Sequence, residues 1–226
     1  MIWKLIDSGL NPGMYNMDFD LMLAKTLKAD EAILRLYGWK PYCISLGANQ
    51  SEDSLNIEKV INDKLDFVKR PTGGRAILHA EELTYSVVYP SRKNYSLNDL
   101  YKQVNLALIK GLTLFDEKLQ EVSLEHTEPH FPSFYKEEKS AVCFAASSRN
   151  EINYKGRKLV GSAQRNLGNV ILQHGSILCG DYHKNIVEYL NLQKISVDEI
   201  SEEMDNTTTD LKEILNFKID IEKLKE

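Results

Sequence analysis

The sequence has 226 residues, of which 42% are hydrophobic, 27% charged and 9% aromatic, a composition typical of globular proteins that excludes long disorder. This length can bury a single core, so we expect one domain over residues 1–226. The net charge of -5 is concentrated near the C-terminus. Residues 198–226 hold ten acidic and four basic side chains (4 - 10 = -6), so the rest of the sequence has a net charge of +1. With no basic excess, the sequence excludes a typical nucleic-acid binder.

The N-terminal segment, the apolar runs and the cysteine spacing indicate the cellular compartment that we expect. No N-terminal segment has the pattern of a signal peptide, and no apolar run is long enough to span a membrane, so we expect a cytoplasmic protein without a membrane partner. The three cysteines, Cys43, Cys143 and Cys179, are far apart and include no Cys-x-x-Cys pair. They predict free thiols, no disulfide framework and no metal site.

The first predicted elements alternate strands and helices. Residues 2–6 alternate as a strand does, and residues 18–28 place apolar side chains on one helical face. The apolar runs 32–37 and 42–46, separated by a Gly-to-Pro turn, predict an antiparallel pair. Cys43 then lies in a strand and is expected to be a core residue.

The next segment predicts more strands. Residues 56–64 predict a short helix, and residues 67–70 a strand. Residues 75–79 and 83–89 predict a hairpin around Ala80-Glu81-Glu82. In its second strand, one face is predicted to carry Leu83, Tyr85, Val87 and Tyr89.

A longer helix is predicted from Leu97. Ser96 is the expected N-cap, and Asp99 completes a variant of the capping box. The apolar stripe of this helix predicts a buried face rather than a cofactor site, and it comprises Leu100, Val104, Leu108, Leu112 and Phe115.

The second half predicts further strands and an acidic end. Residues 116–140 are polar and contain two prolines, which favours a lid or binding loop. Strands are predicted at 151–154, 158–165 and 170–178, followed by short helices and by an acidic helical segment over 197–226, with no accessory C-terminal domain. The class is therefore α+β, with a mixed or antiparallel sheet and helices packed on one side.

The segment Arg70-Pro71-Thr72-Gly73-Gly74-Arg75 stands between two strands. Adjacent glycines there permit positive φ angles or a close approach of the backbone to a ligand. By itself the pattern is better explained by a hairpin turn without a ligand, and the same holds for Lys155-Gly156-Arg157.

Three segments taken together, 70–79, 156–165 and 171–177, resemble the biotin/lipoate protein ligase and transferase superfamily. The resemblance implies a catalytic domain with a second, smaller sheet. It also implies that Lys158 touches the carbonyl end of an acyl group. The substrate-binding residues that it implies are Arg70, Gly73, Gly74, Arg75, His79, Gly161, Ser162, Ala163, His174 and Gly175.

Cys143 is the residue that separates branches of this superfamily. A cysteine in the apolar stretch 141–146 is ordinarily a buried hydrophobic residue. Its position shortly before the Lys158 segment, however, looks like the cysteine-dependent octanoyltransferase that charges the glycine-cleavage carrier protein. The resemblance implies that Cys143 carries a thioester and that no cofactor is needed. Lys158 is the candidate cation for lowering the pKa of the Cys143 thiol.

The implied reaction moves an octanoyl or lipoyl group from an acyl-carrier protein to Cys143. The acceptor is then a lysine of the glycine-cleavage carrier protein or of another lipoyl domain. His79 or His174 could take the proton of the attacking amine, although a histidine at a strand end usually has a structural, hydrogen-bonded role.

Three alternatives remain open at this point. An ATP-dependent lipoate ligase with a separate accessory chain would use ATP and Mg²⁺ and would not need Cys143. An amidotransferase between carrier proteins would use the same thioester. A non-catalytic partner would only bind carrier proteins. In each case we expect a monomer, because no exposed heptad or repeated apolar face indicates self-association.

Overall fold

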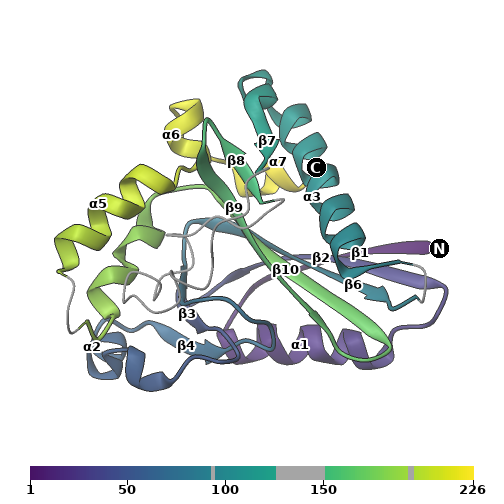
Figure 1. The fold of residues 1–226 in the computed structure, drawn as a ribbon, viewed down its shortest axis with the longest axis horizontal. Helices are drawn as coiled ribbons and strands as arrows, with labels where there is room; N and C mark the ends of the chain where they lie inside the picture. Colours follow the sequence, from purple (N-terminus) through teal and green to yellow (C-terminus); the bar gives the residue numbers. More distant parts are fainter. Residues whose placement is uncertain (93–94, 126–150, 193–195) are drawn as a thin grey trace.

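The computed structural model describes residues 1–92, 95–125, 151–192 and 196–226 (Figure 1). Its larger sheet has seven strands in the order β1-β2-β6-β10-β9-β8-β7. The pair β1 and β2 is parallel and the other neighbours are antiparallel, so the sheet is mixed. The strands are β1 (Ile2–Asn11), β2 (Glu31–Trp39), β6 (Glu82–Pro90), β7 (Val122–Leu124), β8 (Ile152–Tyr154), β9 (Arg157–Asn166) and β10 (Val170–Leu178).

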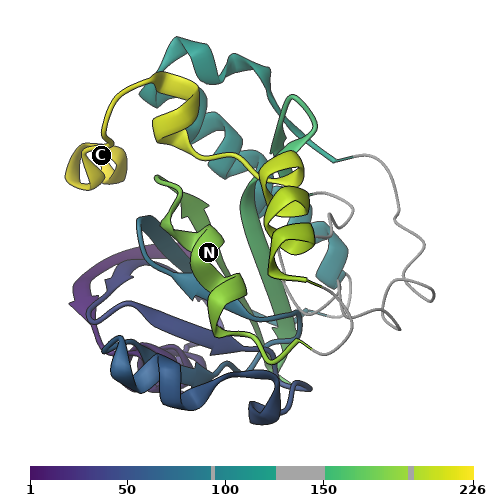
Figure 2. The same cartoon turned by 90° about the vertical axis from the view of Figure 1, so that its left-hand side faces the viewer.

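A smaller sheet has three strands in the order β4-β3-β5. They are β3 (Cys43–Leu46), β4 (Asp66–Lys69) and β5 (Ile77–His79), with β3 parallel to β4 and antiparallel to β5. Their apolar side chains form a core with helices α2 (Ile57–Asn62), η5 (Tyr182–Tyr189) and α5 (Val197–Thr207). Figure 2 shows α2 near the bottom of the molecule, whereas the C-terminus lies near the top.

Helices pack on both faces of the larger sheet. Helix α1 (Gly13–Thr26) lies on one face and α3 (Leu97–Phe115) on the other (Figure 1). The α1 side includes Leu23, Ile33, Val88 and Leu172, whereas the α3 side includes Leu36, Leu83, Val87, Leu100 and Leu112. The predicted class, with a mixed sheet and a smaller second sheet, is confirmed, but the helices are divided between two faces where we expected one side.

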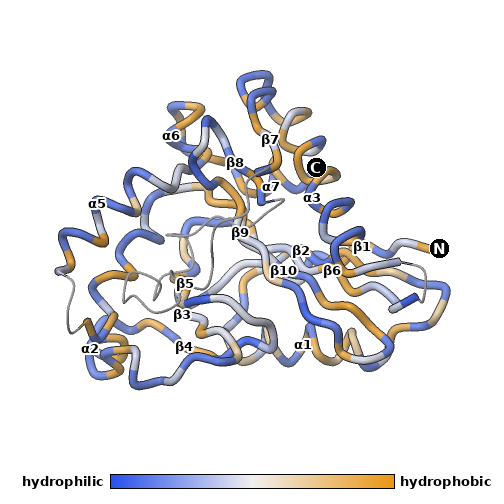
Figure 3. Tube along the Cα trace, viewed as in Figure 1, coloured by the Kyte–Doolittle hydropathy of each residue, from blue (hydrophilic) through white to orange (hydrophobic). Residues whose placement is uncertain are grey.

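The remaining helices lie around the edges. They are η1 (Glu52–Ser54), η2 (Glu117–Glu121), α6 (Leu211–Leu215) and α7 (Ile221–Lys225). In Figure 3, α5 is coloured mostly hydrophilic, with hydrophobic residues at intervals. Of these, Ile200 and Met204 are buried against the small-sheet core. No helix within the described ranges combines the length and the apolar composition needed to cross a membrane.

Several predicted elements are confirmed. Helix α3 begins after Ser96, whose Oγ accepts a hydrogen bond from Asp99 N at 3.1 Å while Asp99 Oδ2 accepts one from Ser96 N at 3.0 Å. This is the predicted capping box. In the segment 116–140, η2 and β7 occupy part of what we expected to be a loop, and residues 126–140 lie outside the described residues.

The predicted antiparallel pair between residues 32–37 and 42–46 is wrong. Strand β2 pairs with β1 and β6, while β3 lies in the other sheet between β4 and β5. The predicted hairpin between 75–79 and 83–89 is wrong for the same reason, because β5 and β6 belong to different sheets. A short connection favours pairing, but here both connections carry the chain from one sheet to the other.

Helix α1 also begins five residues before the predicted start, at Gly13 instead of Asp18. Gly13 N donates a hydrogen bond of 2.7 Å to the Asp66 carboxylate, which satisfies an amide at the start of the helix. Because Asp66 is 53 residues away, local sequence does not reveal this cap.

Candidate functional site

A narrow pocket lies between the two sheets and includes seven of the predicted substrate-binding residues. Its free space is about 20 Å³, roughly that of one water molecule. The predicted residues along it are Arg70, His79, Gly161, Ser162, Ala163, His174 and Gly175, and the other lining residues include Met17, Tyr37, Trp39 and Ile77. The three sequence segments of the predicted pattern therefore meet at one place.

Strand register explains why these residues meet. His174 on β10 is opposite Ala163 on β9, and Ser176 is opposite Gly161. Because alternate residues of a strand share a face, all four positions project to the same side of the sheet. The small residues Gly161 and Ala163 leave space beside the larger side chains of β10.

Arg70 holds the loop of residues 70–75 together. Its Nε and Nη2 donate to Gly73 O, Nη2 also donates to Arg75 O, and Nη1 donates to the carbonyl oxygen and Oγ of Ser45, over 2.7 to 3.2 Å. These five bonds match the five N–H groups of a guanidinium. Arg70 therefore fixes the loop at the edge of the pocket.

The glycines of this loop differ in what they require. Gly74 has a φ of 97°, which favours glycine, and a Cβ on Gly47 would collide with Gly74 O. A Cβ on Gly73 would meet nothing within 4 Å. Gly73, Gly74 and Arg75 are not among the residues described as lining the pocket, so their predicted contact with substrate stays a prediction.

His79 belongs to a buried chain of hydrogen bonds. Arg70 donates to Ser45 Oγ at 3.1 Å, and His79 Nε2 lies 2.7 Å from the same oxygen. On its other side His79 Nδ1 is 2.8 Å from Glu82 Oε1. With the proton on Nδ1, the chain runs continuously from the guanidinium to the carboxylate. Both ring nitrogens are engaged within the protein, which favours a structural role for His79.

Glu82 is the acceptor at the end of this chain. Its Oε1 also accepts hydrogen bonds from Thr84 Oγ1 at 2.5 Å, Ser176 Oγ at 2.8 Å and Trp39 Nε1 at 3.2 Å. Burial alone would raise the pKa of Glu82, but His79 and the hydroxyl donors outweigh it, so the pKa is lowered. A buried carboxylate thus anchors this wall of the pocket.

His174 connects the pocket loop to a second buried carboxylate. Its Nε2 is 2.6 Å from Thr72 Oγ1, and its Nδ1 is 3.8 Å from Asp20 Oδ2. Burial lowers the pKa of His174 below its ordinary value, although Asp20 opposes this effect. At neutral pH the imidazole is therefore uncharged, and both of its nitrogens face protein groups.

Asp20 and Arg35 form an ion pair with no exposed side-chain surface. Arg35 Nη1 donates to Asp20 Oδ1 at 2.7 Å, and Ser86 Oγ donates to the same oxygen at 2.7 Å. Burial alone would raise the pKa of Asp20, but hydrogen bonds and charges from His174 and Arg35 lower it. The pocket wall is thus held by two buried networks, one on each histidine.

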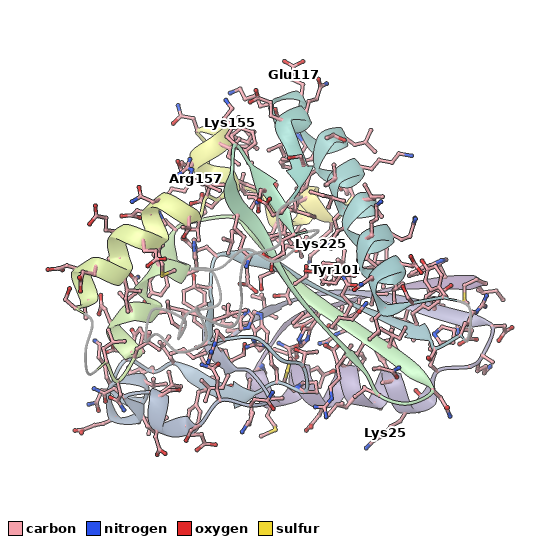
Figure 4. All side chains as sticks on the ribbon, in the orientation of Figure 1. Lys25, Tyr101, Glu117, Lys155, Arg157 and Lys225 are labelled. Atoms are coloured by element: carbon pink, nitrogen blue, oxygen red, sulfur yellow. The ribbon has the colours of Figure 1, made fainter. Side chains whose placement is uncertain are left out.

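Gly175 sits where two strands approach closely. A Cβ there would lie 2.6 Å from Gly161 O and 2.8 Å from both Ser162 Oγ and Tyr85 Cε1. Tyr85 OH and Ser162 Oγ are 2.7 Å apart, and burial raises the pKa of Tyr85 to about 12. Tyr101 of α3, labelled in Figure 4, donates to Ser162 O at 3.3 Å. Glycine at this position lets the strands and this hydroxyl cluster fit together.

Lys158 is buried, whereas its neighbours in the β8–β9 hairpin, Lys155 and Arg157, lie at the outer tip in Figure 4. Its side chain is 2% exposed, and Nζ is 2.9 Å from Glu151 Oε2. The register between β8 and β9 shifts beside it, with Ile152 opposite Val160 and Asn153 opposite Lys158. Such a bulge redirects a side chain, and bulges are frequent near active sites.

Cys143 lies outside the described residues, so its distance from Lys158 stays untested. Cys43 is buried in the core, as predicted, and Cys179 is buried as well, and burial raises the pKa of both thiols. Neither has the lowered pKa of a nucleophile. Within the described ranges, no three His, Cys, Asp or Glu side chains gather to hold a metal ion.

Sequence reasoning missed several pocket residues, among them Trp39, Tyr37, Ser45 and Met17. A signal was present in β6, where Thr84 and Ser86 alternate with apolar residues on a strand that turns out to be buried on both faces. Polar side chains at alternate positions usually indicate solvent exposure. Here they form the polar wall of an interior pocket.

Comparison with known proteins points to one family. Residues 12–226 match the model of the lipoyl protein ligase A/B catalytic domain. The octanoyltransferase LipM of Bacillus subtilis is 37% identical over 182 residues, which cover 78% of this chain and 65% of that protein. The octanoyltransferase LipM of Halalkalibacterium halodurans is 32% identical over 230 residues, covering 99% of this chain and 83% of that protein.

A solved structure supports the fold. It is the bi-partite lipoate protein ligase described with its E2 lipoyl domain from Thermoplasma acidophilum, and it superposes with a TM-score of 0.74. The superposition covers 100% of this chain and 80% of that chain at 17% identity. Similarity at this level concerns the fold.

Proposed function

The chain belongs to the lipoyl protein ligase A/B catalytic domain family, and we propose that it transfers an octanoyl group from an acyl-carrier-protein thioester to a lysine of a lipoyl-domain protein. Relatives at 32–38% identity named octanoyltransferase support this choice within the family. The observation that carries it is the pocket, where the three predicted segments converge between the sheets.

The lining of the pocket suits a hydrocarbon chain. Met17, Ile77 and Trp39 offer apolar surface, and the polar groups of His79 and His174 are occupied by hydrogen bonds to Ser45, Glu82 and Thr72. An apolar chain gains about 0.8 kcal/mol for each methylene that leaves water. The buried networks thus keep the shape of the pocket without presenting charges to the chain.

In the proposed reaction, the thiolate of Cys143 attacks the carbonyl carbon of the donor thioester. A C–S bond to Cys143 forms, the bond to the donor sulfur breaks, and the donor thiolate takes a proton as it leaves. The amine of the acceptor lysine then attacks the acyl-Cys143 carbonyl. The C–N bond forms, the amine loses a proton, and Cys143 leaves as the thiolate. An amide is more stable than a thioester, so no ATP is consumed.

Lys158 is the proposed electrostatic partner in both steps. Its ammonium group would stabilise the negative charge that develops on the carbonyl oxygen and would favour the Cys143 thiolate. The buried ion pair with Glu151, at 2.9 Å, holds the ammonium group in place. A neutral group at this position would remove that stabilisation. We therefore expect Lys158→Met to slow acylation about 100-fold or more, whereas Lys155→Met, at an exposed neighbour, leaves it unchanged.

The test is to incubate the protein with octanoyl-acyl-carrier protein, without ATP, and to measure its intact mass. We expect one octanoyl addition that hydroxylamine removes, present in the wild type and absent in Cys143→Ala. Cys179→Ala is the matched control, because that thiol is buried and should retain the adduct. Adding a lipoyl domain should then discharge the enzyme and add one octanoyl mass to the domain.

The contrary result would support the ligase alternative. If no adduct forms without ATP, but lipoate or octanoate is transferred to the lipoyl domain once ATP and Mg²⁺ are present, the octanoyltransferase proposal is wrong. Transfer that starts only from an octanoylated carrier domain would instead support the amidotransferase.

A further inference from the structure

Glu151 lies against the lysine that the family resemblance assigns to the reaction. Its Oε2 is 2.9 Å from Lys158 Nζ, and the side chains of Glu151 and Lys158 are 3% and 2% exposed. Glu151 directly precedes β8 and Lys158 is the second residue of β9, so both belong to one hairpin. Any nucleophile that reaches a carbonyl group beside Lys158 therefore arrives next to a buried carboxylate.

The backbone around Glu151 is held by contacts other than the ion pair. Its carbonyl oxygen accepts a hydrogen bond of 2.7 Å from Glu125 N, which follows β7, and Lys158 O accepts one of 3.0 Å from Thr209 N. Lys158 also forms a parallel bridge with Thr208. Two segments outside the hairpin thus fix its backbone on either side of the pair. Removing the charge of Glu151 should therefore leave the hairpin in place.

The second step of the proposed reaction needs a group that takes a proton from the acceptor. A lysine side chain has an ordinary pKa of about 10.4, so at neutral pH it arrives as an ammonium ion without a lone pair. The ring nitrogens of His79 and His174 already face protein groups. Burial raises the pKa of Tyr85 to about 12 and that of Tyr101 well above its usual range, so neither phenol is a base at neutral pH.

Resting on the proposed function, we propose that Glu151 binds the ammonium group of the acceptor lysine and takes its proton. The carboxylate offers the opposite charge, which lets a second amine lie beside the charged Lys158. Burial disfavours the charged carboxylate and the charged ammonium alike, so it favours transfer of the proton between them. A neighbouring cation such as Lys158 likewise favours the neutral form of the incoming amine.

The proposed step removes two protons from the acceptor nitrogen. The ammonium group gives the first proton to Glu151 and becomes a neutral amine. The nitrogen then attacks the acyl carbon, the C–N bond forms, and the C–S bond to Cys143 breaks. The second proton passes from the nitrogen to the departing thiolate, which becomes a thiol. The first proton passes from Glu151 to water, which restores the carboxylate for the next turnover.

The two half-reactions distinguish this role from that of merely holding Lys158. Wild type and Glu151→Gln are charged with octanoyl-acyl-carrier protein, and the adduct is then discharged with a lipoyl domain or with hydroxylamine, followed by intact mass. Hydroxylamine is uncharged at neutral pH, so it gives up no proton before it attacks. We expect Glu151→Gln to slow discharge by the lipoyl domain about 100-fold or more. Charging, and discharge by hydroxylamine, should proceed at the wild-type rate.

Glu121→Gln is the matched control. Glu121 pairs with Lys155 of the same hairpin at 2.8 Å, but these side chains are 59% and 61% exposed, so all three rates should stay at the wild-type level. Thermal unfolding establishes which variants are folded. If Glu151→Gln is not, Glu151→Asp decides, because it keeps the charge but withdraws it by one methylene. Discharge by the lipoyl domain should then fall about tenfold or more, with discharge by hydroxylamine unchanged.

Three outcomes would overturn the proposal. Equal discharge by the lipoyl domain in folded Glu151→Gln and wild type would overturn this role of Glu151 and leave the transferase activity standing. A parallel loss of charging and of both discharges would also overturn it, because Glu151 then only holds Lys158. If the wild type itself forms no adduct, the proposed transferase activity fails, and the role of Glu151 fails with it.

Discussion

The two faces of the seven-stranded sheet are buried alike but built differently. Toward α3, β2 and β6 present mainly aliphatic side chains such as Leu36, Leu83 and Val87. On the opposite face, the alternate residues of the same strands include the charged or polar Arg35, Thr84 and Ser86 beside the apolar Ile33 and Val88. Both sets are shielded from solvent, so burial alone does not account for the difference.

Stability alone would favour apolar residues on both faces. Buried ion pairs are costly to desolvate and are often no more stabilising than well-packed hydrophobic residues. The pocket face nevertheless holds Asp20, Arg35, Glu82 and two histidines in connected networks. What these networks provide is position, since each of these five side chains has its orientation fixed by at least one hydrogen bond. The α3 face packs in a larger hydrophobic cluster than the α1 face does.

The largest effect expected from this contrast is at the Asp20–Arg35 pair. Arg35→Met leaves the Asp20 carboxylate buried without its cation, and should cost about 3–5 kcal/mol in unfolding free energy. Adding Asp20→Leu removes that unpaired charge. The double variant should therefore lose less unfolding free energy than the two single variants lose together, by about 1 kcal/mol or more. Urea unfolding of the wild type, the two single variants and the double variant measures the coupling energy between Asp20 and Arg35. Simple additivity would show that the pair is not a linked unit.

On the α3 face, the matching change is Leu100→Ala. Leu100 is 2% exposed and packs in the main hydrophobic core. Its truncation should cost about 3 kcal/mol through lost burial and a residual cavity. Octanoyl-adduct formation per folded molecule should not change, because the side chain lies across the sheet from the pocket. A large loss of activity in folded Leu100→Ala would contradict this separation of the two faces.

Gly175→Ala should have a smaller effect on stability, about 1–3 kcal/mol, because the new methyl group would overlap Gly161 O and the Tyr85 ring. The matched control is Gly73→Ala, where the new Cβ meets nothing within 4 Å, and its unfolding free energy should change by less than about 0.5 kcal/mol. Urea unfolding measures both. If Gly73→Ala keeps its stability but loses adduct formation, Gly73 lies against the bound acyl group, as the family resemblance implies.

These contrasts also show how far the sequence alone could lead. Local signals were reliable where the interaction is local: Ser96 and Asp99 predicted the start of α3, and alternation predicted the β6 face that packs on it. Strand partners were not reliable, because β3 and β5 joined a second sheet that short connections do not suggest. The first cap of α1 was missed because it comes from Asp66, far along the chain.

For the site, the family resemblance selected the residues and the fold brought seven of them together. What the resemblance did not supply were the side chains that hold them, such as Ser45, Thr72 and Glu82. Each of these is an ordinary strand or loop residue in sequence, and its role depends on contacts with segments up to 102 residues away. Such long-range pairs leave no periodic pattern.

The smallest effect on stability at neutral pH is expected for a substitution of His174. The same substitution tests whether a group on the pocket face makes the unfolding free energy depend on pH below neutrality. Burial lowers the pKa of His174, so below about pH 6.5 the unfolded chain binds a proton that the folded protein does not. Stability contributed by the neutral imidazole is therefore complete above pH 6.5 and falls as the pH falls toward the lowered folded pKa. His174→Gln, which cannot be protonated, should have a flatter dependence of unfolding free energy on pH between 6.5 and 5.

Gln173→Leu on the α3 face should keep the wild-type dependence, because that position does not titrate. Equal dependence in all three proteins would mean that the acid sensitivity of the fold resides in other groups, such as His183, whose pKa burial lowers to about 4.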